Sequence, residues 1–237
     1  MRKIFNIPID TATLSAEIVI QAQGIPRSVI PDERTVRLAQ EAISVYRSMA
    51  KPTGVIMEVS IEEFEATYAG EERNDPSSPI EPIFRRSDDL ALFAVTIEEE
   101  ICQEISRQFS IGEYALGSMI DTVASEGTEM TAQAVEDFYR GHLQAINRFD
   151  SGSGILRFSP GYCGWHISGQ KKLFQSLHPE DIGIELNQSY LMRPIKSISG
   201  IIITGRNEIF RFDDSFSFCA DCATHSCRER IEAIQRQ

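Results

Sequence analysis

The chain has 237 residues, of which 42% are apolar and 24% are charged, values typical of a folded globular protein. Asp and Glu number 35 and Lys and Arg number 23, so the formal net charge is −12 at pH 7. Such an acidic surface repels phosphate backbones and anionic lipids, which disfavours nucleic acid or a membrane as the main partner. No uncharged stretch reaches the roughly 18 apolar residues of a membrane span. Asp10 interrupts the start before an apolar run of signal-peptide length forms, so we expect a cytoplasmic protein.

The N-terminal third predicts two helices that flank a strand. Asp32 can cap a helix over residues 33–50, because apolar side chains recur there at three- and four-residue spacing. A short apolar run at 55–59 predicts a strand, and a Ser-x-x-Glu capping box at Ser60 begins the second helix directly after it. Residues 71–89 hold three prolines and mixed charge, so we expect a loop.

The middle of the chain predicts a buried strand followed by helices. The strand is a continuous apolar run at 90–95. Thr96 and Ser110 each begin a Ser/Thr-x-x-Glu pattern, and we expect each to cap a helix. The second helix is long, or is a pair joined at Gly127, and it would present a narrow seam for close packing at that glycine. No linker divides the chain, so we predict one α+β domain over residues 1–237.

After the glycine- and serine-rich residues 151–154, the sequence no longer predicts long helices and becomes rich in turns. Arg157 stands in the turn-rich run Arg-Phe-Ser-Pro-Gly-Tyr, where a guanidinium beside a Pro-Gly turn offers a planar set of donors for a carboxylate or phosphate. Tyr162 can cover an apolar or aromatic face of such a ligand. The alternative is that Arg157 only ties down a loop. Beyond this run we expect a short helix at 171–177 and strands at 184–186 and 197–204.

Several short motifs follow one another between residues 157 and 200. They are Arg-Phe-Ser-Pro-Gly-Tyr, a Lys-bearing helix, Gly-Ile-Glu-Leu-Asn-Gln-Ser, Met-Arg-Pro and Ser-Ile-Ser-Gly. This succession resembles the activation (reactivation) domain of cobalamin-dependent methionine synthase. The resemblance implies a bent antiparallel or mixed sheet with packed helices. A Rossmann fold is not expected, because the chain has no Gly-x-Gly-x-x-Gly after a strand.

The resemblance also implies a function. Domains of this family bind AdoMet and donate its methyl group to a cobalamin in the inactive cob(II)alamin state, after one-electron reduction. By this resemblance Arg157 would hold the AdoMet carboxylate and Asp10 would meet its amino group. Ile202 stands where the family carries an aromatic pair after Ser-x-Ser-Gly. The candidate AdoMet-binding residues are Arg157, Ser159, Pro160, Gly161, Tyr162, Ile202 and Asp10.

The length of the chain leaves room for this domain but not for the homocysteine, folate and cobalamin modules of a complete methionine synthase. We therefore expect a stand-alone reactivation module. Its partner would be a separate corrinoid protein or a split methionine synthase, which would carry the cobalamin.

A second constellation, Cys219-x-x-Cys222-x4-Cys227, lies in the Cys-rich tail at residues 213–237. Three thiolates at this spacing can bind zinc or an iron–sulfur cluster, and the sequence does not choose between them. Cys163 is the candidate fourth ligand, with the histidines at 166 and 225 as alternatives. The alternative to a metal site is a tail without regular structure whose cysteines are free.

The cysteines give rise to an alternative function. In it, the chain is a metal or iron–sulfur accessory protein that passes electrons to a corrinoid protein on the same scaffold. A third hypothesis is a structural partner that docks onto a corrinoid protein without binding either ligand.

Overall fold

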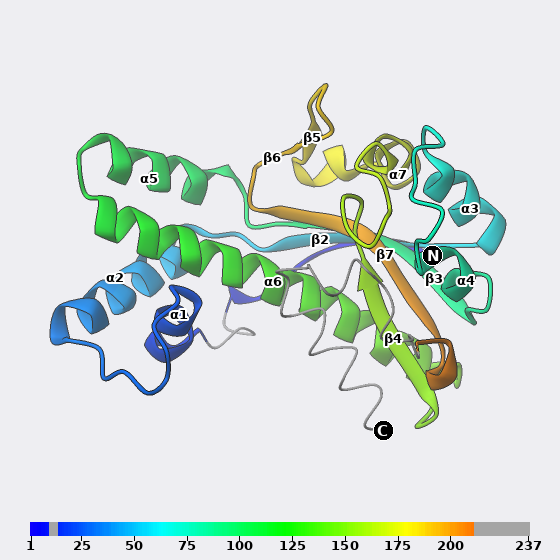
Figure 1. Cartoon of the computed structure of the whole chain (residues 1–237), viewed down its shortest axis with the longest axis horizontal. Helices are drawn as coiled ribbons and strands as arrows, with labels where there is room; N and C mark the ends of the chain where they lie inside the picture. The colour runs from blue at the N-terminus through cyan, green and yellow to red at the C-terminus, as the bar shows by residue number, and fades with distance from the viewer. Residues whose placement is uncertain (10–13, 211–237) are drawn as a thin grey trace.

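The computed structural model describes residues 1–9 and 14–210, and this region is built around a five-stranded antiparallel sheet (Figure 1). The strand order is β1-β2-β3-β7-β4, and β7 bends as it crosses the sheet in Figure 1. A two-stranded antiparallel sheet, β5-β6, lies outside it. The strands are β1 (Arg2–Asn6), β2 (Thr53–Val59), β3 (Asp89–Thr96), β4 (Ser153–Phe158), β5 (Glu185–Leu186), β6 (Met192–Arg193) and β7 (Ser197–Arg206).

Seven α-helices surround the main sheet in the described part of the chain. The longest, α6, runs along one face of the sheet and continues into a helical lobe with α1, α2 and α5, while α3, α4 and α7 lie at the other end (Figure 1). Each of these helices is too short or too polar to span a lipid bilayer. Their bounds are α1 (Ala16–Ala22), α2 (Glu33–Met49), α3 (Ile61–Ala69), α4 (Ile80–Phe84), α5 (Glu99–Ser110), α6 (Tyr114–Ala145) and α7 (Gly169–Leu177).

The central strand β3 is buried along its whole length because helices cover both faces of the sheet. Side chains alternate between the faces of a strand. Leu90 and Leu92 therefore pack with the cluster that includes α3, α4 and α7, whereas Phe93 and Val95 pack against α6. A third cluster fills the lobe between α1, α2, α5 and α6. This layering explains why the strand reads as a continuous apolar run.

The expected fold class is confirmed. The sequence left open an antiparallel or a mixed sheet, and every pairing between the described strands is antiparallel. A Rossmann fold, whose sheet is parallel, is therefore excluded for this part of the chain.

Local capping signals predicted two helices well. Asp32 caps α2 by accepting a hydrogen bond from the backbone N–H of Thr35 at 2.7 Å. Ser60 and Glu63 form the reciprocal capping box of α3. Both helices begin where the sequence places them, because a side chain there satisfies a backbone donor that the helix leaves unpaired.

Three other sequence predictions are wrong. Thr96 ends β3 instead of capping α5, and its hydroxyl accepts a hydrogen bond from the N–H of Glu98. Ser110 is the last residue of α5, and α6 begins only at Tyr114 without a side-chain cap. The expected loop at 71–89 contains α4, whose apolar side chains are buried. Burial of these side chains outweighs the loop signal of the prolines.

Candidate functional site

Arg157 lies near the end of β4, and its side chain faces α6. It follows Ile155 at the two-residue period of a strand, and Ile155 belongs to the core cluster on the α6 side of the sheet. The side chain is only 5% exposed. The sequence placed Arg157 within a turn, whereas the structure places it in a strand that leads into that turn.

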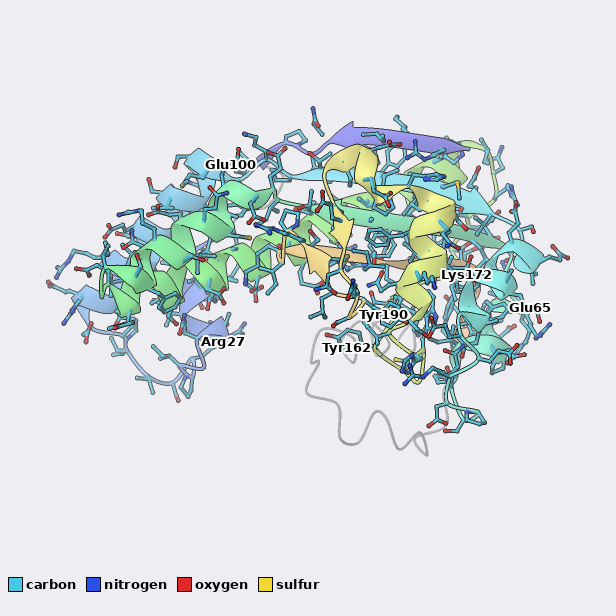
Figure 2. The ribbon with its side chains drawn as sticks, turned by 90° about the horizontal axis from the view of Figure 1, so that it is seen from above. Arg27, Glu65, Glu100, Tyr162, Lys172 and Tyr190 are labelled. Carbon is cyan, nitrogen blue, oxygen red and sulfur yellow. The ribbon has the colours of Figure 1, made fainter. Side chains whose placement is uncertain are left out.

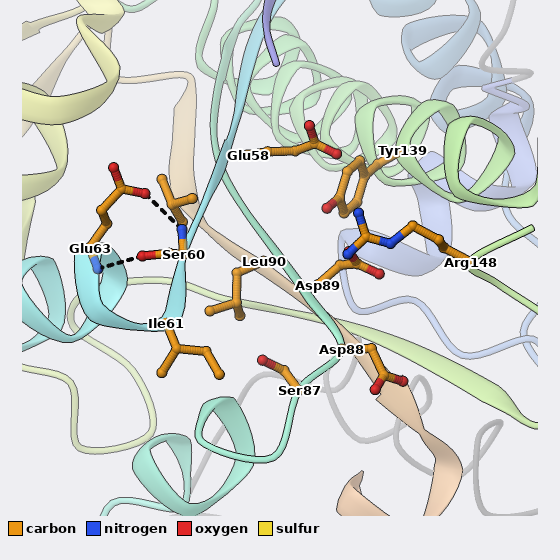
Figure 3. A pocket seen from close by; sticks show the side chains of 11 residues that line it. Glu58, Ser60, Ile61, Glu63, Ser87, Asp88, Asp89, Leu90, Tyr139 and Arg148 are labelled. Carbon is orange, nitrogen blue, oxygen red and sulfur yellow. Dashed lines mark hydrogen bonds and ion pairs between the residues drawn. The ribbon is translucent and has the colours of Figure 1, made fainter. Parts of the chain in front are cut away.

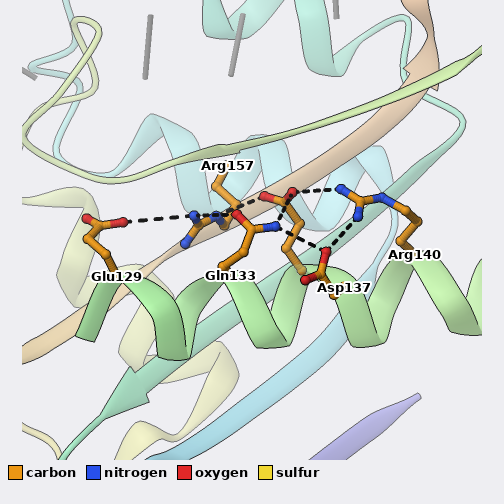
Figure 4. A network of polar contacts seen from close by, with 6 residues as sticks. Glu129, Gln133, Asp137, Arg140 and Arg157 are labelled. Atoms are coloured by element: carbon orange, nitrogen blue, oxygen red, sulfur yellow. Dashed lines mark hydrogen bonds and ion pairs between the residues drawn. The ribbon is translucent and has the colours of Figure 1, made fainter. Parts of the chain in front are cut away.

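The guanidinium of Arg157 is fixed by side chains of α6 (Figure 4). Its Nε donates to Oε2 of Glu136 at 2.9 Å, and Nη2 donates to Oε1 of Gln133 at 3.3 Å. Glu136 is itself buried and also accepts a hydrogen bond from Arg140 at 3.0 Å. Two arginines therefore share one buried carboxylate, and this arrangement orients the Arg157 guanidinium.

Further acidic residues of α6 extend the site beyond Glu136. Oε2 of Glu129 lies 3.9 Å from Nη2 of Arg157, a distance of ionic contact but not of a hydrogen bond. Glu126 is three residues earlier, and burial, together with the nearby Glu129 carboxylate, raises its pKa above the ordinary value. The site thus places a guanidinium beside a row of carboxyl groups.

Sequence reasoning missed Glu129, Gln133 and Glu136 because this part of α6 was examined for its apolar spacing. Glu126, Glu129, Gln133 and Glu136 follow one another at intervals of three, four and three residues. That spacing places them on one face of a helix. The same periodicity, applied to polar side chains, is the signal that could have found them.

The turn after β4 contains the remaining residues of the Arg-x-x-x-Gly-Tyr motif. The N–H of Gly161 donates to the carbonyl of Trp165 at 2.7 Å, and the N–H of Tyr162 donates to the carbonyl of Ser159 at 3.2 Å. Gly161 has a φ of +95°, a conformation that glycine adopts at no steric cost. Pro160 is buried, whereas Tyr162 is 56% exposed and is labelled together with Tyr190 in Figure 2.

The Ser-Ile-Ser-Gly motif lies in β7, next to this turn. A Cβ on Gly200 would lie 2.1 Å from the carbonyl oxygen of Phe158, so only glycine permits β7 and the end of β4 to approach this closely. Ser199 donates to Gln170 of α7 at 2.7 Å, and both side chains are buried. The motif thereby joins β4, β7 and α7 at the turn.

Two further contacts connect the motif region with α6. Lys196 lies 2.8 Å from Oδ1 of Asp121 and donates to Ser125 at 2.7 Å. Ile202 pairs with Arg157 in the β4–β7 register, but its side chain is completely buried in the core on the α6 face. Ile202 therefore supports the site from within the core.

Residues 80–212 match the family described as "Vitamin B12 dependent methionine synthase, activation domain". The chain belongs to this family. The resemblance seen in the sequence is thus confirmed, and the matched range contains β3, α6, the turn after β4 and β7.

The fold agrees with this family. The solved structure "Crystal Structure of the MetH Reactivation Domain bound to AdoHcy" superposes with a TM-score of 0.62 at 14% sequence identity, covering 100% of this chain and 88% of that one. No curated protein matches the chain in sequence. The structural likeness extends over the N-terminal residues, which the sequence match leaves out.

The predicted metal ligands are only partly within the described region. The cysteines at 219, 222 and 227 and the histidine at 225 lie outside it. Asp10, the predicted contact of the AdoMet amino group, also lies outside the described residues. Cys163 is half-buried and packs against the core cluster that includes α3, α4 and α7, and its carbonyl accepts a hydrogen bond from Ser78 at 2.7 Å. Nδ1 of His166 lies 2.9 Å from the hydroxyl of Ser168. Residues 1–9 and 14–210 contain no group of three potential metal ligands, so the metal centre stays a prediction from the sequence.

Proposed function

We propose that this chain binds AdoMet at Arg157 and donates its methyl group to a cobalamin carried by a separate corrinoid protein or split methionine synthase. The observation that carries the proposal is the oriented guanidinium of Arg157 beside the acidic row of α6. The MetH reactivation domain, which shares the fold, is bound to AdoHcy, and AdoHcy is AdoMet without the transferred methyl group.

The residues present fit the amino-acid end of AdoMet. That end carries a carboxylate and an ammonium group on one carbon, so its site needs a cationic and an anionic side chain close together. Arg157 and Glu129 meet this need, since their charged atoms are 3.9 Å apart. Glu129 is half-exposed and can turn toward an ammonium group, whereas Glu136 keeps the guanidinium oriented from its buried side. Asp10 remains the second candidate for the ammonium contact.

The turn after β4 suits the remainder of the ligand. Tyr162 exposes more than half of its side chain, and a phenol ring can stack on a purine. The backbone of Ser159, Pro160 and Gly161 would line the ligand between this ring and Arg157. AdoMet supplies the methyl group, and the chain's own contribution is to hold the ligand so that the sulfonium faces the corrinoid partner.

We also propose that residues 1–237 act as one domain, including the Cys-rich tail at 213–237. The N-terminal residues share structural layers with the matched region, because β1 and β2 complete the same sheet as β3. In addition, α2 packs against α6 around Tyr46. This shared core supports treating the chain as a single unit in experiments.

Calorimetry with ligand analogues tests the binding proposal, and the comparison of analogues on the wild-type chain leaves the buried ion pair intact. We expect AdoMet to bind the wild-type chain and decarboxylated AdoMet to bind at least about tenfold more weakly, because a charge-assisted hydrogen bond is lost. In Arg157→Lys the difference in affinity between AdoMet and decarboxylated AdoMet should shrink, since an ammonium group cannot form the two parallel hydrogen bonds that a guanidinium forms with a carboxylate. Equal affinity of the wild type for both ligands would remove Arg157 from the carboxylate site, and the absence of any heat would reject AdoMet binding.

A second experiment tests the methyl transfer. The chain is added to a separately purified corrinoid protein in the cob(II)alamin state, together with a one-electron reductant and AdoMet labelled in its methyl group. We expect labelled methylcobalamin, followed by its visible spectrum, only when all components are present. If every candidate corrinoid protein remains unmethylated while AdoMet still binds, the chain is a binding module and the proposed transfer is wrong.

A further inference from the structure

A hollow lies where β2 ends, β3 begins and α6 approaches its C-terminus (Figure 3). Its volume is about 370 Å³, within the range of sites for small organic molecules. Neither Arg157 nor the turn after β4 lines it. The lining residues that carry its charge and polarity are Glu58, Glu63, Asp88, Asp89, Tyr139 and Arg148.

The hollow is strongly acidic. Four carboxylates line it, against one guanidinium, that of Arg148. Arg148 forms an ion pair with Oδ1 of Asp89, and the N-terminal amine of Met1 donates to Glu58 at 3.0 Å. Glu63 accepts the capping hydrogen bond of α3. These contacts leave an excess of negative charge facing the hollow.

Two buried polar atoms in the wall have no hydrogen-bond partner. They are Oδ2 of Asp89 and the hydroxyl oxygen of Tyr139. The Asp89 side chain is 4% exposed, and Tyr139 is completely buried. Figure 3 shows both side chains at the hollow, with the Arg148 guanidinium beside Asp89. An unpaired buried polar atom is costly, so a pair of them facing one hollow marks a place where a ligand can supply the missing contacts.

We propose that this hollow binds a small organic cation through an ammonium group placed between Asp89 and Tyr139. An ammonium group has N–H donors for Oδ2 of Asp89 and for the Tyr139 oxygen, and its charge offsets the acidic wall. An anion would meet four carboxylates. A divalent metal ion is disfavoured, because no three potential metal-ligating side chains converge within the described residues.

The proposed site is separate from the Arg157 site, although both face α6. Arg157 and Asp89 lie on different strands, with β7 between them: Arg157 of β4 pairs with Ile202 of β7, and Ile202 pairs with Ala91 of β3. Asp89 is two residues further along β3, toward its N-terminal end. The proposal therefore does not depend on AdoMet binding. The two sites can be tested independently.

The Tyr139→Phe variant gives the sharpest test, because it removes only the hydroxyl. If no water satisfies that hydroxyl, the substitution relieves a buried unpaired group and raises the melting temperature of the ligand-free chain. The same change should weaken ammonium binding several-fold. This combination of greater stability with lower affinity is the signature of a ligand-binding group that is unsatisfied in the free protein.

Titration calorimetry of the full chain would use 1,4-diaminobutane as the probe, with 1,4-butanediol as the uncharged analogue and Mg²⁺ as the metal. We expect the diamine alone to bind. Asp89→Asn should weaken this binding by about tenfold or more, because a charge-assisted contact is lost. Glu41→Gln, which removes one exposed carboxylate from α2, serves as the control and should leave the affinity within about twofold.

Three results would overturn the proposal. Equal binding of the diamine and the diol would show that charge plays no part. Equal effects of Asp89→Asn and Glu41→Gln would reduce the binding to general attraction by an acidic protein. Tyr139→Phe with a lowered melting temperature and an unchanged affinity would show that water satisfies the hydroxyl and that the hollow is merely hydrated.

Discussion

Glu136 and Arg157 form a buried ion pair between the longest helix and a strand at the edge of the main sheet. Their Oε2 and Nε atoms are 2.9 Å apart, and neither side chain is more than 5% exposed. Since β4 pairs only with β7 among the described strands, this contact adds a second anchor by joining one face of β4 to α6. The pair thus serves the packing of the fold as well as the orientation of the proposed AdoMet site.

Glu136→Gln should lower the free energy of unfolding by about 3 kcal/mol, because it leaves the buried guanidinium without its charged partner. Urea denaturation followed by circular dichroism measures the change. Arg140→Gln is the matched control, since Arg140 contacts the same carboxylate from a half-exposed position and should cost less than about 1 kcal/mol. Equal losses in the two variants would contradict a dominant role for the buried pair.

Two glycines of α6 should respond in opposite directions to replacement by alanine. A Cβ on Gly127 would lie 2.4 Å from the ring and the hydroxyl of Tyr46, which is buried, so Gly127→Ala should destabilise by about 1–3 kcal/mol. Gly141 has no atom within 4 Å of such a Cβ, and Gly141→Ala should stabilise by up to about 1 kcal/mol through helix propensity. Thermal unfolding of both variants checks this, and a stabilised Gly127→Ala would show that the predicted seam is not closely packed.

Gly200→Ala should disturb both stability and ligand binding. The added methyl group would collide with the carbonyl of Phe158, which belongs to the backbone and cannot rotate away. We expect β7 to move from β4, with a loss of about 2 kcal/mol or more on unfolding. AdoMet affinity should fall as well, because the turn that begins at Ser159 would shift. A variant with wild-type stability and affinity would contradict the close approach of these strands.

Glu126→Gln should change the pH dependence of stability. Burial raises the pKa of Glu126 in the folded state above its ordinary value of 4.5, and the charge of Glu129 adds to the effect. The folded chain therefore keeps this proton to higher pH than the unfolded chain. Stability is lost as the pH rises from about 4.5 through the folded-state pKa, and the loss remains at neutral pH.

The glutamine variant cannot ionise, so it should be more stable than the wild type at pH 7 and nearly equal to it at pH 3.5. Thermal unfolding across this pH range measures the difference. Glu41→Gln, at an exposed position of α2, should show no such trend. A Glu126→Gln curve parallel to that of the wild type would mean that this carboxyl group is not penalised by burial.

The parts of the fold that the sequence predicts are those that local chemistry determines. Asp32 and Ser60 satisfy nearby backbone donors, and the apolar run of β3 marks a strand covered on both faces. The long helix and its glycine seam also follow from periodicity, although the sequence left one helix or two open. In contrast, Thr96 resembles a cap, but its place in the sheet outweighs that local preference.

The sequence predicted only one of the two parts of the candidate site. The motif from Arg157 to Tyr162 was found because its residues are contiguous. Its partners Glu136 and Glu129 lie on α6, at least 21 residues before Arg157 in the chain, and only the fold brings them to the guanidinium. A contact of this kind leaves no mark in local spacing, so an ion pair between β4 and α6 could not be predicted.

The unbroken course of α6 has a mechanical consequence. Glu129, beside the guanidinium, and Tyr139, in the acidic hollow, stand ten residues apart on one hydrogen-bonded rod, a separation of about 15 Å along its axis. Rotation of individual side chains cannot alter that spacing. The two positions therefore keep a fixed separation as long as the helix stays intact, and the close packing of Gly127 on Tyr46 holds the middle of that helix against α2.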